Sequence, residues 1–120
     1  MPHPCPACGF EVFDEPAGSY DICPVCDWED DEVQLRFPAM RGGANTESLF
    51  EWQQQILQRL PPHVVVHEGF HRCADWRPLT QEECRDTDRA PTTGKEYFDA
   101  VGAEEPKYYW RPTGSRGRGP

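Results

Sequence analysis

Apolar side chains recur at helical spacing over one long stretch of the chain, residues 46–60. They are Leu49, Trp52, Ile56, Leu57 and Leu60. Asn45 precedes the stretch as a suitable N-cap, and Pro61-Pro62 ends it because proline cannot continue a helix. The pattern predicts an amphipathic helix over 46–60, whose apolar stripe covers the layer packed against it.

Shorter patterns in the first half of the chain predict a β-hairpin. Residues 11–13 and 19–22 have the composition of short strands, and Pro16-Ala17-Gly18 lies between them as a turn. We therefore expect these two strands to pair with each other. Residues 33–44, which contain Pro38 and Gly42-Gly43, should be irregular.

The second half of the chain is weakly patterned. Residues 64–66 predict a strand, and residues 79–84 resemble a helical turn capped by Thr80. Several aromatic side chains near the C-terminus are expected to dock on the body of the protein: Tyr97, Phe98, Tyr108, Tyr109 and Trp110. Residues 113–120 should form a disordered tail.

Composition indicates that the fold needs a cross-link. The chain has 120 residues, of which 13 are proline and 10 glycine, and 37% are hydrophobic. So small a core is commonly held by disulfides or by a metal ion. The N-terminus lacks the features of a signal peptide and no stretch is apolar enough to span a membrane, so we expect a cytoplasmic protein. Cytoplasmic thiols stay reduced, which favours a metal.

Four of the six cysteines have the spacing of a metal site. Cys5, Cys8, Cys23 and Cys26 form the pattern C-x2-C-x14-C-x2-C, in which two pairs of thiolates complete a tetrahedron around one ion. Zinc in a structural role is the expected ion, and iron in a rubredoxin-like site uses the same four sulfurs. A thioredoxin-like redox pair is disfavoured because that motif usually occurs once.

The residues around the cysteines fit tight turns. Pro6 and Pro24 follow the first cysteine of each pair and remove an N–H that such a turn does not use. Gly9 follows the first pair and supplies a positive φ, and Asp27 stands at the equivalent position of the second pair. A site closed by four cysteines has no open coordination position, so it predicts a structural role.

Three stretches carry a family resemblance: residues 5–10 (CPACGF), residues 18–31 (GSYDICPVCDWEDD) and residues 42–49 with Gly42-Gly43-Ala44-Asn45 and Ser48-Leu49. Together they resemble the cysteine-rich CPCC family of small bacterial proteins, which implies a zinc-ribbon-like core and no particular activity. The resemblance covers roughly residues 4–60, and residues 75–79 are similar to a segment that often follows. Ala7 replaces the third residue of the motif Cys-Pro-Cys-Cys, which indicates Cys5 and Cys8 as the ligands.

The expected fold class is therefore small α+β. It has a zinc-ribbon-like β-hairpin with two Cys-Pro-X-Cys knuckles, one amphipathic helix and a loosely structured C-terminal half. We expect the zinc-ribbon-like domain with its helix over residues 1–62, an extension packed on it over 63–112, and the tail over 113–120.

Charge suggests the kind of partner. The net charge is −9, and residues 1–60 hold 11 acidic residues against three basic ones. Trp28, Glu29, Asp30 and Asp31 beside the second knuckle are a candidate partner-binding surface, although Trp28 also suits the core. We expect a basic protein partner and no membrane. Nucleic acid is disfavoured because residues 5–26 contain no Lys or Arg.

These features predict a non-enzymatic interaction module stapled by metal, and its most concrete form is an immunity protein that neutralises a toxin. One alternative is a nucleic-acid-associated zinc ribbon, and another is an enzyme that depends on cysteine and histidine. His63, His67, His71 and Cys73 leave a second metal site or a Cys–His pair open. Free buried thiols are the default for Cys73 and Cys84.

Overall fold

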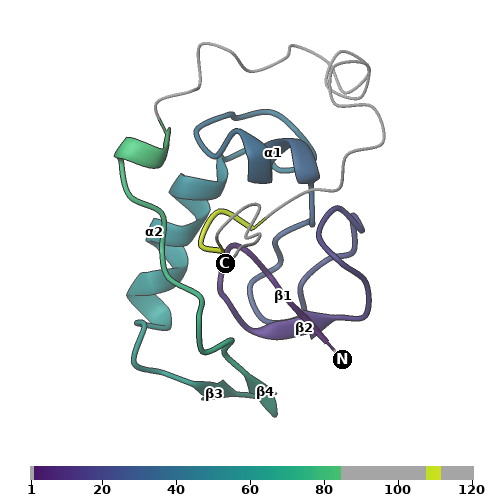
Figure 1. The fold of residues 1–120 in the computed structure, drawn as a ribbon, viewed down its shortest axis with the longest axis vertical. Helices are drawn as coiled ribbons and strands as arrows, with labels where there is room; N and C mark the ends of the chain where they lie inside the picture. The colour runs from purple at the N-terminus through teal and green to yellow at the C-terminus, as the bar shows by residue number, and fades with distance from the viewer. Residues whose placement is uncertain (1, 85–107, 112–120) are drawn as a thin grey trace, which may run out of the picture.

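The computed structural model describes residues 2–84 and 108–111 (Figure 1). Its elements in chain order are β1 (His3–Pro4), β2 (Glu11–Phe13), α1 (Glu32–Arg36), α2 (Leu49–Arg59), β3 (Val66–His67) and β4 (Phe70–His71). The fold class is small α+β, as predicted, with hairpins, a principal helix and a cluster of four cysteines. Tyr97, Phe98 and the predicted tail at 113–120 lie outside the described residues.

Two short antiparallel pairings, each around one cysteine knuckle, make up the N-terminal part. β1 pairs with β2, and the first knuckle connects them. Ile22 bridges to Glu29 across the second knuckle. The prediction that residues 11–13 pair with 19–22 is therefore wrong. Each Cys-Pro-X-Cys turn reverses the chain, so each segment finds its partner across its own knuckle.

The predicted amphipathic helix is present as α2, but it starts later than expected. Its N-cap is Ser48, whose hydroxyl accepts from the Glu51 N–H while the Glu51 carboxylate accepts from the Ser48 N–H. This capping box satisfies N–H groups that a helix start leaves without partners. Asn45 is not the cap, because its side chain instead exchanges two hydrogen bonds with the main chain of Glu29.

A short helix, α1, occupies part of the stretch expected to be irregular. The carboxylate of Asp31 caps it by accepting from the N–H groups of Val33 and Gln34. The helix has only five residues, which is too short to produce a detectable periodic pattern. Figure 1 shows α1 near one end of α2, with the β3–β4 hairpin at the opposite end.

The core is built around the cysteines. Leu49, Ile56 and Leu60 of the α2 region pack into the same cluster as the two knuckles, so the apolar stripe of the helix covers the knuckles. Trp110 is buried, and the rings of Tyr108 and Tyr109 pack against the cluster. The expectation that this aromatic segment docks on the body is confirmed.

The described part of the second half contains one hairpin and one helical turn. β3 pairs with β4 around a turn in which Glu68 and Gly69 both have positive φ. The strand β3 begins at Val66 and not at the predicted residue 64. Thr80 and Glu83 cap the turn that follows by reciprocal hydrogen bonds, as predicted. No helix in the described residues is long and apolar enough to cross a membrane.

Candidate metal centre

The two knuckles bring four buried cysteine sulfurs together. The Sγ atoms of Cys5 and Cys26 are 3.7 Å apart, as are those of Cys8 and Cys23, and all four lie within 4.8 Å of one another. Four thiolates arranged tetrahedrally at about 2.3 Å from one ion would lie about 3.8 Å from each other. A disulfide would need about 2.05 Å, and all four thiols are free. The four cysteines are therefore positioned to hold a metal ion.

The local backbone of each knuckle follows the sequence expectation. Gly9 has φ +82° and Asp27 has φ +70°, so both positions use the left-handed conformation. The N–H of Gly9 donates to the carbonyl of Cys5 at 2.7 Å, and the N–H of Asp27 donates to that of Cys23 at 2.9 Å. The two knuckles thus repeat one geometry, in which both cysteine side chains of a pair turn to the same side.

The electrostatics of the four sulfurs favour a bound cation. Burial raises the pKa of the Cys5 and Cys8 thiols well above its usual value, whereas hydrogen bonding to Cys26 lowers the pKa of Cys23. The Cys23 sulfur also accepts from the N–H groups of Val25 and Cys26 at 3.3 and 3.4 Å. Four adjacent thiolates in an apolar core repel one another, and a divalent ion removes that repulsion. The donor set therefore fits a metal ion such as zinc.

The candidate partner residues beside the second knuckle lie mostly inside the protein. Trp28 is fully buried, with its ring edge-on to that of Trp52 at 5.6 Å between centroids, so its core role is confirmed. Asp30 and Asp31 are also buried and Glu29 is half-buried. Asp30 and Asp31 are therefore enclosed by the protein, and whether this region binds a partner stays a prediction.

Their burial has a local cause, because both aspartates bind main-chain N–H groups. One Asp30 oxygen accepts from the N–H groups of Gly18 and Ser19 and from the Ser19 hydroxyl. Asp31 caps α1 and also accepts from the N–H of Ala44 at 2.9 Å. Both carboxylates therefore organise loops that flank the metal centre, instead of facing solvent.

The histidines do not assemble into a second site. Within residues 2–84 and 108–111, the four cysteines are the one group of three or more potential ligands that comes together. His63 and His71 are exposed, and the ring of His67 lies 6.2 Å from that of Phe10.

The two remaining cysteines, Cys73 and Cys84, are half-buried. Cys73 donates to the Asp75 carboxylate at 2.7 Å instead of pairing with a histidine. Burial and this hydrogen bond raise its pKa, and burial raises that of Cys84. A raised pKa disfavours the thiolate, which is the reactive form of cysteine.

Buried polar residues that carry no sequence signal support the centre. Gln53 of α2 donates to the carbonyl of Pro6 in the first knuckle and accepts from the N–H of Leu79. Arg72 donates to the carbonyl of Cys8. Neither belongs to a recognisable motif, and each becomes visible only when segments distant in the chain are brought together.

These observations define the class as a small α+β domain with four buried cysteines that are positioned to hold a metal ion. Residues 3–59 match the model of the family described as Cysteine-rich CPCC, and this part of the chain belongs to that family. The match spans both knuckles, α1 and α2, and it ends before Arg72 and the aromatic segment 108–111. No curated protein matches the chain.

Proposed function

We propose that the protein is a non-enzymatic protein-interaction module whose fold is held by one structural zinc ion at Cys5, Cys8, Cys23 and Cys26. The observation that carries the structural role is the closed set of four buried sulfurs. All four positions of a tetrahedral site are then taken by protein ligands, so none is left for water or a substrate. The raised pKa of Cys73 further disfavours the alternative of a cysteine-dependent enzyme.

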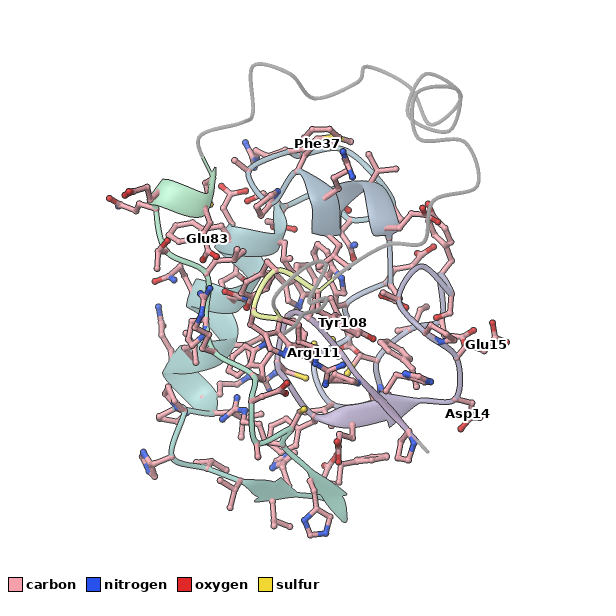
Figure 2. All side chains as sticks on the ribbon, viewed as in Figure 1. Asp14, Glu15, Phe37, Glu83, Tyr108 and Arg111 are labelled. Atoms are coloured by element: carbon pink, nitrogen blue, oxygen red, sulfur yellow. The ribbon has the colours of Figure 1, made fainter. Side chains whose placement is uncertain are left out.

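The interaction role rests on four exposed acidic side chains between residues 14 and 27, which we term the acidic edge: Asp14, Glu15, Asp21 and Asp27. Figure 2 shows Asp14 and Glu15 pointing away from the body of the protein. Ile22, next to Asp21, is 63% exposed and so is available to a partner. Residues 1–35 contain no Lys or Arg to neutralise these acids.

An exposed apolar side chain next in sequence to an exposed carboxylate suits a basic protein partner. Long-range attraction would speed the encounter, and burial of Ile22 would stabilise the complex. The same charge repels the phosphates of nucleic acid, which disfavours the zinc-ribbon alternative of that class. The most specific form of the proposal is an immunity protein, whose binding would inhibit a toxin.

The zinc part is tested by metal analysis of the purified full chain. We expect about one zinc per chain, with Cys23→Ser losing both the metal and the folded state. The apparent contribution of structural zinc is on the order of 10 kcal/mol, which is comparable to the net stability of a whole domain. A metal-free chain that melts at the same temperature as the zinc form would refute the structural role. Iron in place of zinc would support the rubredoxin-like alternative.

The interaction part is tested by reversing charge at the acidic edge. Asp14→Lys with Asp21→Lys should abolish capture of a specific protein from cell extract. A control that changes the net charge equally at exposed positions elsewhere, Gln54→Lys, Gln58→Lys and Glu82→Lys, should retain capture. The captured protein, once purified, should bind more weakly as salt rises, because exposed charges are screened within about 10 Å at 0.1 M. Equal capture by both variants would refute the acidic edge as the binding surface.

A further inference from the structure

Arg72 is a buried arginine without a carboxylate partner. Only 8% of the residue is exposed, and within residues 2–84 and 108–111 its guanidinium donates to main-chain carbonyls alone. The acceptors are those of Cys8 at 2.8 Å, Pro61 at 2.6 Å, Val64 at 2.9 Å and Leu60 at 3.0 Å. No ion pair involves Arg72 within the described part of the chain. Because buried charges are nearly always compensated, its counter-charge must be sought nearby.

The cysteine cluster provides that charge. Four thiolates and one divalent ion sum to a charge of −2, and Arg72 binds the carbonyl of one ligand, Cys8. The guanidinium also lies over the rings of Phe10 at 4.6 Å and Trp76 at 5.1 Å, which favour a cation.

The residues that follow Arg72 bind the same knuckle. Cys73 donates its N–H to the carbonyl of Gly9 at 2.7 Å, and Trp76 donates its indole N–H to that of Pro6 at 3.1 Å. The Trp76 ring fills the space where Gly9 has no side chain, since a Cβ there would lie 2.4 Å from it. Residues 72–76, which we call the clasp, therefore bind three carbonyls of the first knuckle from a segment beyond the family match.

We infer that Arg72 is the counter-charge of the metal centre and that the clasp holds the metal in place by closing the first knuckle. Release of the ion requires the knuckle to open, and opening must break the bonds that the clasp makes. Loss of the arginine charge leaves the charge of −2 uncompensated in a region of low dielectric. The inference rests on the metal site of the proposed function and is independent of the interaction role.

Two substitutions separate the charge of Arg72 from its hydrogen bonds. Arg72→Lys keeps the positive charge but has a different donor geometry, and Arg72→Gln keeps an amide donor but is neutral. Arg41→Gln is the matched control, because it removes the same charge from an exposed side chain that pairs with Glu51. Each full-length protein is loaded with zinc, and its zinc affinity and rate of zinc loss are measured by competition with a chromogenic chelator.

We expect Arg72→Gln to weaken zinc binding by about 10- to 100-fold, the range typical of residues that support metal ligands from outside the coordination sphere. Arg72→Lys should lose much less, and Arg41→Gln should match the unmodified protein. In the cobalt-substituted proteins, the thiolate-to-metal charge-transfer band should move to longer wavelength only in Arg72→Gln. Loss of a nearby positive charge raises the energy of the sulfur electrons, a change that a purely structural contact would not produce.

The outcomes distinguish this inference from the proposed function. If the unmodified chain binds no metal, the proposed function itself fails. If the unmodified chain binds zinc but Arg72→Lys loses as much affinity as Arg72→Gln, or fails to fold where Arg72→Gln folds, Arg72 acts through hydrogen bonds and the counter-charge is refuted. An unshifted cobalt band in Arg72→Gln would also refute it.

Discussion

Two buried glutamines allow the cost of a lost hydrogen-bond partner to be tested by comparison within one protein. Gln34 in α1 and Gln53 in α2 are both fully buried, and leucine has nearly the same size as glutamine. Replacing either by leucine therefore keeps the packing and removes polar contacts. The expected difference between the two variants follows from the number of buried N–H groups that each substitution leaves without an acceptor.

Gln34→Leu leaves two such donors. The side-chain oxygen of Gln34 accepts from the main-chain N–H and from the side-chain amide of Asn45, both at 3.0 Å. Its NH₂ group donates to the carbonyls of Met40, Asn45 and Glu47. Each buried donor left without a partner costs about 1–3 kcal/mol, so we expect a loss of about 4 kcal/mol.

Gln53→Leu leaves one such donor, the N–H of Leu79, which Gln53 accepts at 2.8 Å. The other groups keep a partner, because the carbonyl of Pro6 still accepts from Trp76 at 3.1 Å and the Tyr109 hydroxyl still donates to the carbonyl of Arg77. The expected loss is therefore about 2 kcal/mol, half of that for Gln34→Leu.

Equilibrium unfolding in urea measures both losses. The two variants and the unmodified protein are compared at the same excess of free zinc, and the zinc affinity of each is measured so that the contribution of metal binding can be subtracted. Equal losses, or a larger loss for Gln53→Leu, would refute the count of unpartnered donors as the controlling quantity. Losses below about 0.5 kcal/mol, which is the usual scatter for surface substitutions, would show that water replaces the missing partners.

Two further predictions concern the glycines and Asp30. Gly9→Ala should lower the free energy of unfolding by at least about 2 kcal/mol more than Gly42→Ala does. Both positions have a φ near +80°, but of the two only Gly9 would place its new Cβ against another side chain, that of Trp76. Similar losses of stability in thermal unfolding would contradict this prediction. Asp30 has one buried oxygen without a partner in the described residues, and burial raises the pKa of its carboxyl from the ordinary 3.8. We therefore expect the Asp30→Asn variant to melt at the same temperature as the unmodified protein, or at a higher one, at pH 7. The stability that the neutral carboxyl contributes is complete below about pH 3.9 and is lost as pH rises through the raised pKa, so this advantage should shrink on acidification. A much lower melting temperature of Asp30→Asn at pH 7 would show that the charge itself is required.

The sequence alone determined the metal centre and the turns that build it. Cys5, Cys8, Cys23 and Cys26 could be identified because a knuckle is a local structure, set by the spacing of its ligands. The positive φ at Gly9 and Asp27 was predictable for the same reason, since it depends on the turn in which each residue lies. The amphipathic helix was also predictable, because its apolar side chains repeat at helical spacing over more than two turns.

Only the tertiary structure decided which polar residues are buried. The sequence suggests a partner-binding surface at the acids after Cys26, yet Asp30 accepts hydrogen bonds from a loop that lies 11 and 12 residues away. Gln53 reaches the first knuckle across 47 residues of sequence, and Arg72 reaches it across 64. The fate of a polar side chain depends on the donors and acceptors that distant segments bring to it. No local sequence pattern contains those partners, whereas the two cysteine ligands of each knuckle lie within four residues of sequence.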